Sequence, residues 1–305
     1  MKKQFLIVLA FTLLFASCKK EGKIENKKLN VVTTTSMITD LVKNIGGDLI
    51  EINGLMGSGV DPHLYKASEG DVSKLVNADV IFYNGLHLEG KLVEVFEKMG
   101  HQNVKTIAIG ESLKKNTLIG SDYFASNYDP HIWFSVENWK TITAFVVKKL
   151  IETDPKNTKA FETNGKEYLA KLETLDSELK NKIATLPKEK RILVTAHDAF
   201  SYFGKAYDFT VVGLQGLSTT TEAGVQDVQK LAKFIIEKEV KAIFVESSVP
   251  KRTIEALQAT VESKGHKVTI GGTLFSDALG NANTKEGTYI GMFEYNVNTI
   301  INALK

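Results

Sequence analysis

Apolar and polar positions along this chain alternate between short apolar runs typical of β-strands and stretches with the three-to-four spacing of amphipathic helices. Strands are expected at 29–34, 49–56, 80–83 and 104–107, with helices at 36–45, 67–78 and 92–99. From residue 191 the plan repeats, with strands at 192–195, 210–213, 242–246 and 267–270 and helices at 199–207, 224–239 and 251–264. Strands and helices that alternate in this way predict parallel βαβ units, and therefore an α/β fold class with two lobes.

One long helix is predicted between the two parts. After Pro155 and before Pro187, apolar residues recur every three or four positions through a segment rich in lysine and glutamate. The helix has about 30 residues, or about 45 Å, and constrains two lobes more than a glycine-serine linker would. The expected domains are therefore a lobe at 29–150, a linking backbone helix at 151–188 and a lobe at 189–305. The apolar stripe of the helix is Phe161, Gly165, Tyr168, Leu172, Leu175, Leu179 and Ile183.

Residues 1–17 have the pattern of a signal peptide rather than of a folded element. Two lysines precede an apolar run of about 11 residues, which is too short to span a bilayer as a mature helix. Small residues then stand before Cys18, an order that resembles a bacterial lipobox in which the cysteine is lipidated. An ordinary signal peptide with an incidental cysteine is the alternative. Residues 18–28 are polar and charged, which suits a flexible tether.

Composition excludes several function classes. Cys18 is the only cysteine, so the rest of the chain has neither disulfides nor thiolate metal ligands. The formal net charge of +2 includes Lys2 and Lys3, so the processed chain is close to neutral. The sequence contains no basic patch of the kind that would indicate a nucleic-acid partner.

The candidate chemistry lies in histidine and aspartate motifs at the ends of predicted strands. Asp-Pro-His occurs twice, ending at His63 and at His131, and its proline gives a stiff turn that sets the direction of each imidazole. His197 follows the strand at 192–195, and Asp277 follows the last predicted strand. The carboxyl ends of parallel strands form the crevice where ligands bind. Imidazole nitrogens and carboxylate oxygens suit Zn²⁺ or Mn²⁺, so the pattern predicts a metal binder.

Each motif also has an interpretation without a metal. One Asp-Pro-His tripeptide is compatible with an ordinary turn, and Asp277 alone with a helix N-cap. His101 and His266 adjoin turn glycines and are expected to be exposed. His87 lies in a loop that could approach the crevice and is left outside the ligand set. Glu246 ends a strand and is expected to be structural or part of the crevice wall, with the role of a base as the alternative if a metal-bound water existed.

Six segments carry a resemblance to a known family. They are Asp-Pro-His-Leu-Tyr (61–65), Ala-Asp-Val-Ile-Phe-Tyr-Asn-Gly (78–85), Asp-Pro-His-Ile-Trp (129–133), Thr-Ala-His-Asp-Ala-Phe (195–200), Gly-Leu-Gln-Gly-Leu-Ser (213–218) and Ser-Asp-Ala-Leu-Gly (276–280). In this order they resemble motifs of the TroA-like family of zinc- and manganese-binding solute-binding proteins, which supply ABC importers. The resemblance covers essentially the whole chain after the tether.

The resemblance implies two α/β lobes joined by one long backbone helix, with a metal buried in the cleft between them. The resemblance also implies four metal ligands, namely His63 and His131 from the first lobe and His197 and Asp277 from the second. The implied function is an extracytoplasmic solute-binding protein that captures a divalent cation and delivers it to an ABC permease with its ATPase subunit. We expect a monomer, lipid-anchored at Cys18 on the periplasmic side of the membrane or at the cell surface.

The sequence narrows the candidate metals to zinc and manganese. Many zinc-binding members carry a histidine-rich loop before the second Asp-Pro-His, whereas 111–128 of this chain contains no histidine. Three nitrogens and one carboxylate favour Zn²⁺ by the Irving–Williams order, and a bidentate carboxylate also accommodates Mn²⁺. The expected cargo is therefore Zn²⁺ or Mn²⁺, with iron as a further alternative.

Two other function classes remain as alternatives. A zinc-dependent hydrolase would keep an exchangeable water and usually three protein ligands beside a carboxylate base, and four protein ligands argue against it. A surface adhesin would need a partner-binding patch, and nothing in the sequence indicates one. We therefore expect a transport receptor and not an enzyme.

Overall fold

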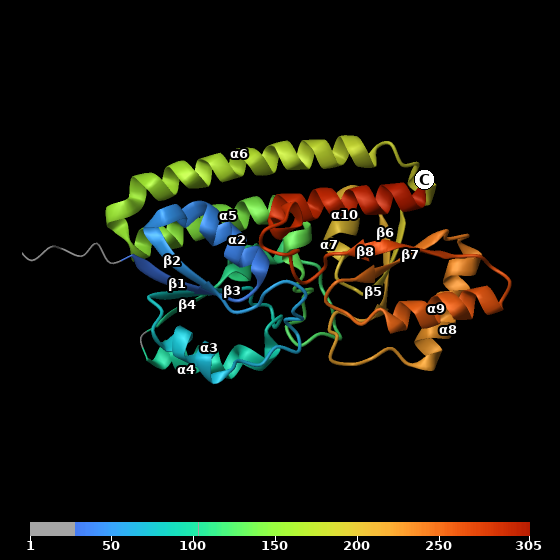
Figure 1. Cartoon of the computed structure of the whole chain (residues 1–305), viewed down its shortest axis with the longest axis horizontal. Coiled ribbons are helices and arrows are strands. Elements are labelled where there is room, and N and C mark those ends of the chain that lie inside the picture. The colour runs from blue at the N-terminus through green and yellow to red at the C-terminus, as the bar shows by residue number, and fades with distance from the viewer. Residues whose placement is uncertain (1–27, 103) are drawn as a thin grey trace, which may run out of the picture.

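Two α/β lobes are joined by a single long helix, α6 (Thr158–Ile183), in a computed structural model that describes residues 28–102 and 104–305 (Figure 1). The predicted α/β class with parallel sheets, two lobes and one connecting helix is confirmed. The predicted signal peptide and the lipidation residue Cys18 lie outside the described residues. Within the described residues, no helix combines the length and the apolar character that crossing a membrane requires.

The N-terminal lobe is built on one parallel sheet with the strand order β2-β1-β3-β4. Its central strands are apolar on both faces because helices cover both faces of the sheet. On one face Val31 and Phe82 pack in the core under α2. On the other face Val32 and Ile81 pack in a second core against α3 and α4. The elements are β1 (Leu29–Thr33), α2 (Ser36–Gly46), β2 (Ile50–Gly54), α3 (Glu69–Val76), β3 (Val80–Tyr83), α4 (Val93–His101), β4 (Lys105–Ala108) and α5 (Val136–Thr153).

The C-terminal lobe has two parallel strand pairs, β5-β6 and β7-β8, and β5 lies against β7. The carboxyl ends of its strands and of the N-terminal sheet carry the loops that meet between the lobes. The elements are β5 (Ile192–His197), α7 (Ser201–Tyr207), β6 (Thr210–Gln215), α8 (Val225–Glu237), β7 (Ala242–Glu246), α9 (Arg252–Ser263), β8 (Thr269–Leu274) and α10 (Tyr289–Leu304).

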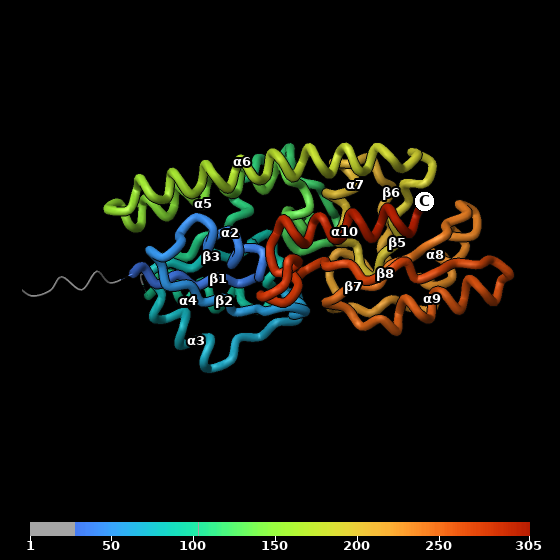
Figure 2. Tube along the Cα trace, turned by 45° about the horizontal axis from the view of Figure 1, so that its top comes forward, coloured from blue at the N-terminus to red at the C-terminus, as the bar shows by residue number. Residues whose placement is uncertain are grey.

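Helix α6 runs along both lobes, as Figure 2 shows. It has 26 residues, somewhat fewer than predicted, and a length of about 39 Å at about 1.5 Å per residue. The entire predicted apolar stripe is buried and packs on α2 and α5 of one lobe and on α10 of the other. One continuous apolar core therefore includes residues of both lobes.

Three elements depart most from the sequence prediction, whereas the bounds of most others shift by one or two residues. Helices α5 and α10 lie in segments to which the apolar pattern assigned no element. Strand β8 runs to Leu274, past the predicted end at 270, because Gly271 and Gly272 weaken the strand pattern in the sequence. In the fold these glycines admit α10 closely: a Cβ at Gly271 would lie 2.6 Å from Cβ of Ala303, and one at Gly272 would lie 2.6 Å from Cγ2 of Thr299.

Candidate metal centre

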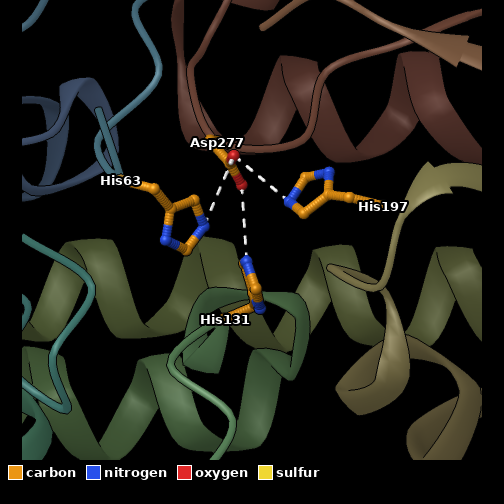
Figure 3. A group of neighbouring side chains, drawn as sticks. All are labelled: His63, His131, His197 and Asp277. Carbon is orange, nitrogen blue, oxygen red and sulfur yellow. Dashed lines mark ion pairs between the residues drawn. The ribbon is translucent and has the colours of Figure 1, made fainter. Parts of the chain in front are cut away.

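Four side chains from distant parts of the chain converge between the lobes (Figure 3). His63, His131, His197 and Asp277 each offer one ligand atom, and these atoms lie within 4.8 Å of one another. The Nε2 atoms of the three imidazoles, in that order, lie 3.9, 3.7 and 3.2 Å from the nearer carboxylate oxygen of Asp277. All four residues are buried. The structure thus brings together the complete set of ligands that the sequence predicts.

The first Asp-Pro-His turn presents His63 from the loop after β2. Oδ1 of Asp61 accepts a 2.8 Å hydrogen bond from the backbone N–H of His63 and closes the turn. Oδ2 of Asp61 accepts a 2.6 Å hydrogen bond from the hydroxyl of Thr219, a residue of the C-terminal lobe. One aspartate therefore fixes the backbone of a candidate ligand and connects it to the opposite lobe.

The second Asp-Pro-His turn presents His131 immediately before α5. Oδ1 of Asp129 again accepts a hydrogen bond from the backbone N–H of the histidine, at 2.9 Å. The same oxygen lies 2.7 Å from Nδ1 of the imidazole ring. A carboxylate on Nδ1 fixes the tautomer and directs Nε2 to the centre of the cluster. The whole contact is buried, and the Tyr202 hydroxyl supports it by donating to the backbone carbonyl of Asp129 at 3.0 Å.

Strand β5 ends at His197, and the neighbouring strand β7 ends at Glu246. Oε1 of Glu246 accepts a 2.8 Å hydrogen bond from the backbone N–H of His197, and Oε2 lies 2.6 Å from its Nδ1. Glu246 therefore orients His197 from behind and does not face the centre of the cluster as a catalytic base would. The sequence analysis missed this role, although a carboxylate at the end of the adjacent strand was a usable signal.

Asp277 lies in the loop after β8, and no helix begins at this residue in the described chain, which leaves the N-cap interpretation without support. The loop is attached to the N-terminal lobe on both sides of Asp277. The indole N–H of Trp133 donates to the carbonyl of Ser276 at 3.0 Å, and the backbone N–H of Leu279 donates to the hydroxyl of Ser36 at 2.8 Å. The loops of both lobes are thus cross-connected next to the cluster.

Burial and mutual charge shift the ionisation of the clustered side chains in different directions. Burial lowers the pKa of His63 to about 3, and the neighbouring imidazoles contribute in the same direction. The charge of Asp277 acts in the opposite direction but does not outweigh burial. Burial also opposes charge on His197, but Asp277 and Glu246 outweigh it and raise the pKa of His197 well above its usual value. Burial disfavours a charged Asp277, but the three imidazoles outweigh it and hold that pKa well below its usual range. Without a cation, the cluster therefore pairs an ionised Asp277 with a protonated His197.

Apart from the 3.2 Å ionic contact between Nε2 of His197 and Oδ2 of Asp277, the atoms that face one another in the cluster have no partner. These atoms are Nε2 of His63, His131 and His197 and both carboxylate oxygens of Asp277, and none of them makes a hydrogen bond. A buried polar atom without a partner destabilises a fold by about 1–3 kcal/mol, and such atoms are rare unless an ion or water completes them. A divalent cation at the centre would satisfy all of them with three nitrogens and one carboxylate, a donor set that suits Zn²⁺ and admits Mn²⁺.

The other histidines lie outside the cluster. His101 is exposed at the end of α4, as the sequence predicts, and His87 is exposed in the loop between β3 and α4. His266 is half-buried, so the expectation that it is exposed is wrong. Its Nε2 lies 3.2 Å from the carbonyl of Val240, because the segment after α9 folds back against the residues that precede β7.

Comparison with known proteins places the chain among metal-binding transport components. Residues 31–303 match the family described as ZnuA, zinc-uptake complex component A, periplasmic. The chain is 48% identical to the manganese-binding lipoprotein MntA of Bacillus subtilis (strain 168) over 295 residues, which are 97% of this chain and 96% of that protein. It is 34% identical to the metal ABC transporter substrate-binding lipoprotein SsaB of Streptococcus sanguinis over 307 residues, 98% and 97% of the two chains. The solved structure of the periplasmic zinc-binding protein TroA from Treponema pallidum matches with a TM-score of 0.89 at 47% identity, covering 91% of this chain and 99% of that one.

Proposed function

Because the chain belongs to the zinc-uptake complex component A family, we propose that it is the substrate-binding protein of an ABC importer for a divalent transition metal. It captures the ion outside the cytoplasm and delivers it to a permease that an ATPase subunit drives. A relative that matches almost the whole chain is named a metal ABC transporter substrate-binding lipoprotein. The observation that carries the proposal is the buried cluster of orphaned nitrogens and carboxylate oxygens.

His63, His131, His197 and Asp277 are the proposed ligands. Two of them come from each lobe, so a bound cation adds one bridge between the lobes to the hydrogen bonds that already cross there. Because α6 and the shared core already join the lobes, capture and release require movement of the ligand loops rather than rotation of a whole lobe. A loop surface that differs between the filled and the empty protein is what a permease can recognise.

Zinc and manganese are both proposed as cargo, with zinc as the tighter ligand. Similarity does not separate them, because the relatives with 48% and 47% identity are named for manganese and for zinc respectively. Three imidazoles and one carboxylate bind Zn²⁺ more tightly than Mn²⁺ by the Irving–Williams order. Equilibrium competition between the two ions should therefore favour Zn²⁺, and preferential retention of Mn²⁺ would contradict this expectation.

Titration of the metal-free protein with Zn²⁺ against a fluorescent chelator tests the ligand set. The wild type should bind one ion per chain, and His63→Ala and His197→Ala should each weaken binding by more than about 100-fold, since loss of a ligand exceeds loss of its supporting partner. His101→Ala is the matched control, because His101 is exposed on α4. Unchanged affinity in both ligand variants would show that the ion binds elsewhere.

Attachment to a membrane is a separate proposal. It rests on the sequence around Cys18, which lies outside the described residues, and on the lipoprotein names of two relatives. The folded chain would then act as a tethered monomer on the periplasmic side of the membrane or at the cell surface. Cys18→Ser should abolish incorporation of radiolabelled fatty acid and release the protein from the membrane fraction, while leaving Zn²⁺ binding unchanged.

A further inference from the structure

A cavity of about 790 Å³ opens onto the candidate metal centre. It lies between the lobes, and His63 is the only one of the four proposed ligands that lines it. His87, which the proposed ligand set does not include, lines the same cavity. The other polar residues of the wall come from both lobes, among them Lys91 and Ser121 from the N-terminal lobe and Asp198, Gln215 and Thr220 from the C-terminal lobe. An ion that reaches the centre through this cavity therefore passes a second imidazole on its way to His63.

The backbone at His87 has an unusual conformation for a residue that is not glycine. His87 has φ 64°, and the preceding Leu86 and Gly85 have φ 52° and 76°, so three consecutive residues are left-handed. Left-handed conformations of residues other than glycine are uncommon and cost on the order of 1 kcal/mol or more, and they concentrate at functional sites. The exposed imidazole of His87 is thus directed by a backbone geometry that the chain adopts at a cost.

Buried polar groups hold this loop in place. Both carboxylate oxygens of the buried Glu89 accept backbone hydrogen bonds, from Asn84 at 2.7 Å and from Gly85 at 3.2 Å. The side-chain amide of Asn84 donates to the carbonyl of Pro130 at 2.9 Å. Pro130 is the central residue of the turn that presents His131. The loop of His87 is therefore hydrogen-bonded directly to the turn that presents His131.

The surroundings of the His87 ring leave space for an imidazole. A Cβ at position 90 would lie 2.9 Å from Nε2 of His87, so Gly90 is the residue that admits the ring. Phe124 stands at the other side, with its ring centroid 6.1 Å from that of His87 in an edge-on arrangement. Both residues line the cavity. The ring is thus placed between a glycine and an aromatic wall, inside the route to the centre.

His63 is the ligand best suited to receive an ion from the cavity. Nδ1 of His131 and Nδ1 of His197 lie against Asp129 and Glu246, at 2.7 and 2.6 Å. Among the described residues, Asp277 is the only carboxylate within 4.0 Å of a ring nitrogen of His63. Without a carboxylate behind it, the His63 ring is the least constrained of the three imidazoles by ionic contacts.

We propose that His87 is a docking ligand, which binds the incoming divalent cation in the cavity and passes it to His63. The proposal rests on the proposed function and adds a kinetic step to it. The ion exchanges a bound water for the imidazole of His87, and it then exchanges His87 for His63 as it enters the centre. His87 contacts the ion only on the route, and the filled centre keeps the four ligands described above.

A contact made only on the route has a distinctive kinetic signature. It lowers the same barrier in both directions, so its loss slows association and dissociation by the same factor. The dissociation constant, which is the ratio of the two rate constants, does not change. A residue of the filled centre behaves differently, because its loss raises the dissociation constant.

Stopped-flow mixing of the metal-free protein with Zn²⁺ and a chelator chase of the filled protein measure both rate constants. Trp133 supplies the optical signal, because its ring centroid lies 5.3 Å from that of His131. The variant is His87→Asn, since asparagine tolerates the left-handed conformation but has no imidazole. We expect both rate constants to fall about tenfold, which corresponds to about 1.4 kcal/mol in the barrier, with an unchanged dissociation constant. The matched control, His101→Asn, should keep both rates.

His87→Gly separates the imidazole from the backbone, because it removes the ring and also relieves the left-handed conformation. It should reproduce the slow rates of His87→Asn. Wild-type rates in either variant would overturn the proposal, and so would a raised dissociation constant with an unchanged association rate, which would assign His87 to the filled centre. Failure of the proposed function has a different signature, namely a wild-type protein that binds no Zn²⁺ at all.

Discussion

The two Asp-Pro-His turns, at 61–63 and 129–131, share one hydrogen bond and differ in a second contact. In both, the aspartate accepts from the backbone N–H of the histidine, at 2.8 and 2.9 Å. In the second turn the same carboxylate oxygen also lies 2.7 Å from the ring of His131. In the first turn the other oxygen of Asp61 accepts from Thr219 across the lobes. One tripeptide thus orients a ring in one place and connects two lobes in the other.

The difference divides the ligands into two kinds. His131 and His197 are held from behind by buried carboxylates, so their Nε2 atoms are prepared for a cation before it arrives. His63 keeps a fixed backbone but a less constrained ring, and it alone borders the cavity. We infer that two rigid imidazoles and Asp277 set the geometry of the filled site, whereas His63 closes it.

Alanine substitution of the two aspartates gives the largest contrast. Asp61→Ala and Asp129→Ala both remove the hydrogen bond that closes the turn, so the difference between them compares the ring contact of Asp129 with the hydrogen bond from Thr219 to Asp61. Asp129→Ala should weaken Zn²⁺ binding by about 100-fold, the upper end of the range for partners of metal-ligating histidines, and Asp61→Ala by about tenfold or less. Chelator competition measures both, and equal losses would refute the distinction between the turns.

Glu246→Gln tests whether a carboxylate behind the ring also supports metal binding at His197, the histidine at the end of β5. The amide can donate to Nδ1 of His197, which favours the tautomer that carries its hydrogen on Nε2 and cannot bind a cation there. Zn²⁺ affinity should fall by about 30-fold, within the range for such partners. Glu237→Gln, at an exposed position on α8, is the control and should bind as the wild type does. A normal affinity in Glu246→Gln would mean that the carboxylate serves only the backbone of β5.

Acidification separates His197 from His63. The raised pKa of His197 means that the metal-free protein carries a proton there at neutral pH, and a cation must displace it. Affinity should therefore fall on going from pH 7 to pH 6, by about tenfold for one displaced proton. His63, with a pKa of about 3, should add nothing in this window. Calorimetry in buffers of different ionisation enthalpy counts the released protons, and a count of zero would contradict the assignment.

Thr219→Val gives the smallest expected effect and tests whether the first Asp-Pro-His turn connects the two lobes. Valine keeps the shape of threonine but removes the hydroxyl that donates to Asp61 across the lobes. Loss of about 1 kcal/mol should weaken Zn²⁺ binding about fivefold, mainly through faster dissociation. A chelator chase measures this rate. Thr221→Val, at an exposed position in the same loop, should leave it unchanged, and a similar acceleration in both would argue against the specific bond.

Much of the framework could be predicted from the sequence because its signals are local. The strands at 80–83 and 242–246 agree with the structure to the residue, since each is a short apolar run between polar boundaries. The stripe of α6 agrees completely, because its spacing of three and four lies within one helix. The four predicted ligands meet because the carboxyl ends of parallel strands face a common crevice. Their binding of a metal stays a prediction.

What could not be predicted depends on contacts between remote segments. Thr219 lies 158 positions from Asp61, and Glu246 lies 49 positions from His197. Nothing in either local sequence shows which aspartate of the two identical tripeptides will face its own ring and which will face the opposite lobe. The partner of each carboxylate follows from the packing of the lobes, and only the three-dimensional structure determines it.

The apolar core that α6 completes includes Val31 from one end of the protein and Leu304 from the other. Neither half of the chain can bury its share of this core alone. A fragment that contains only one half would therefore expose a large apolar surface and aggregate. Heat or denaturant should consequently melt the protein in a single cooperative step. A bound ion would shift that step as a whole, which makes melting temperature a convenient screen for cargo.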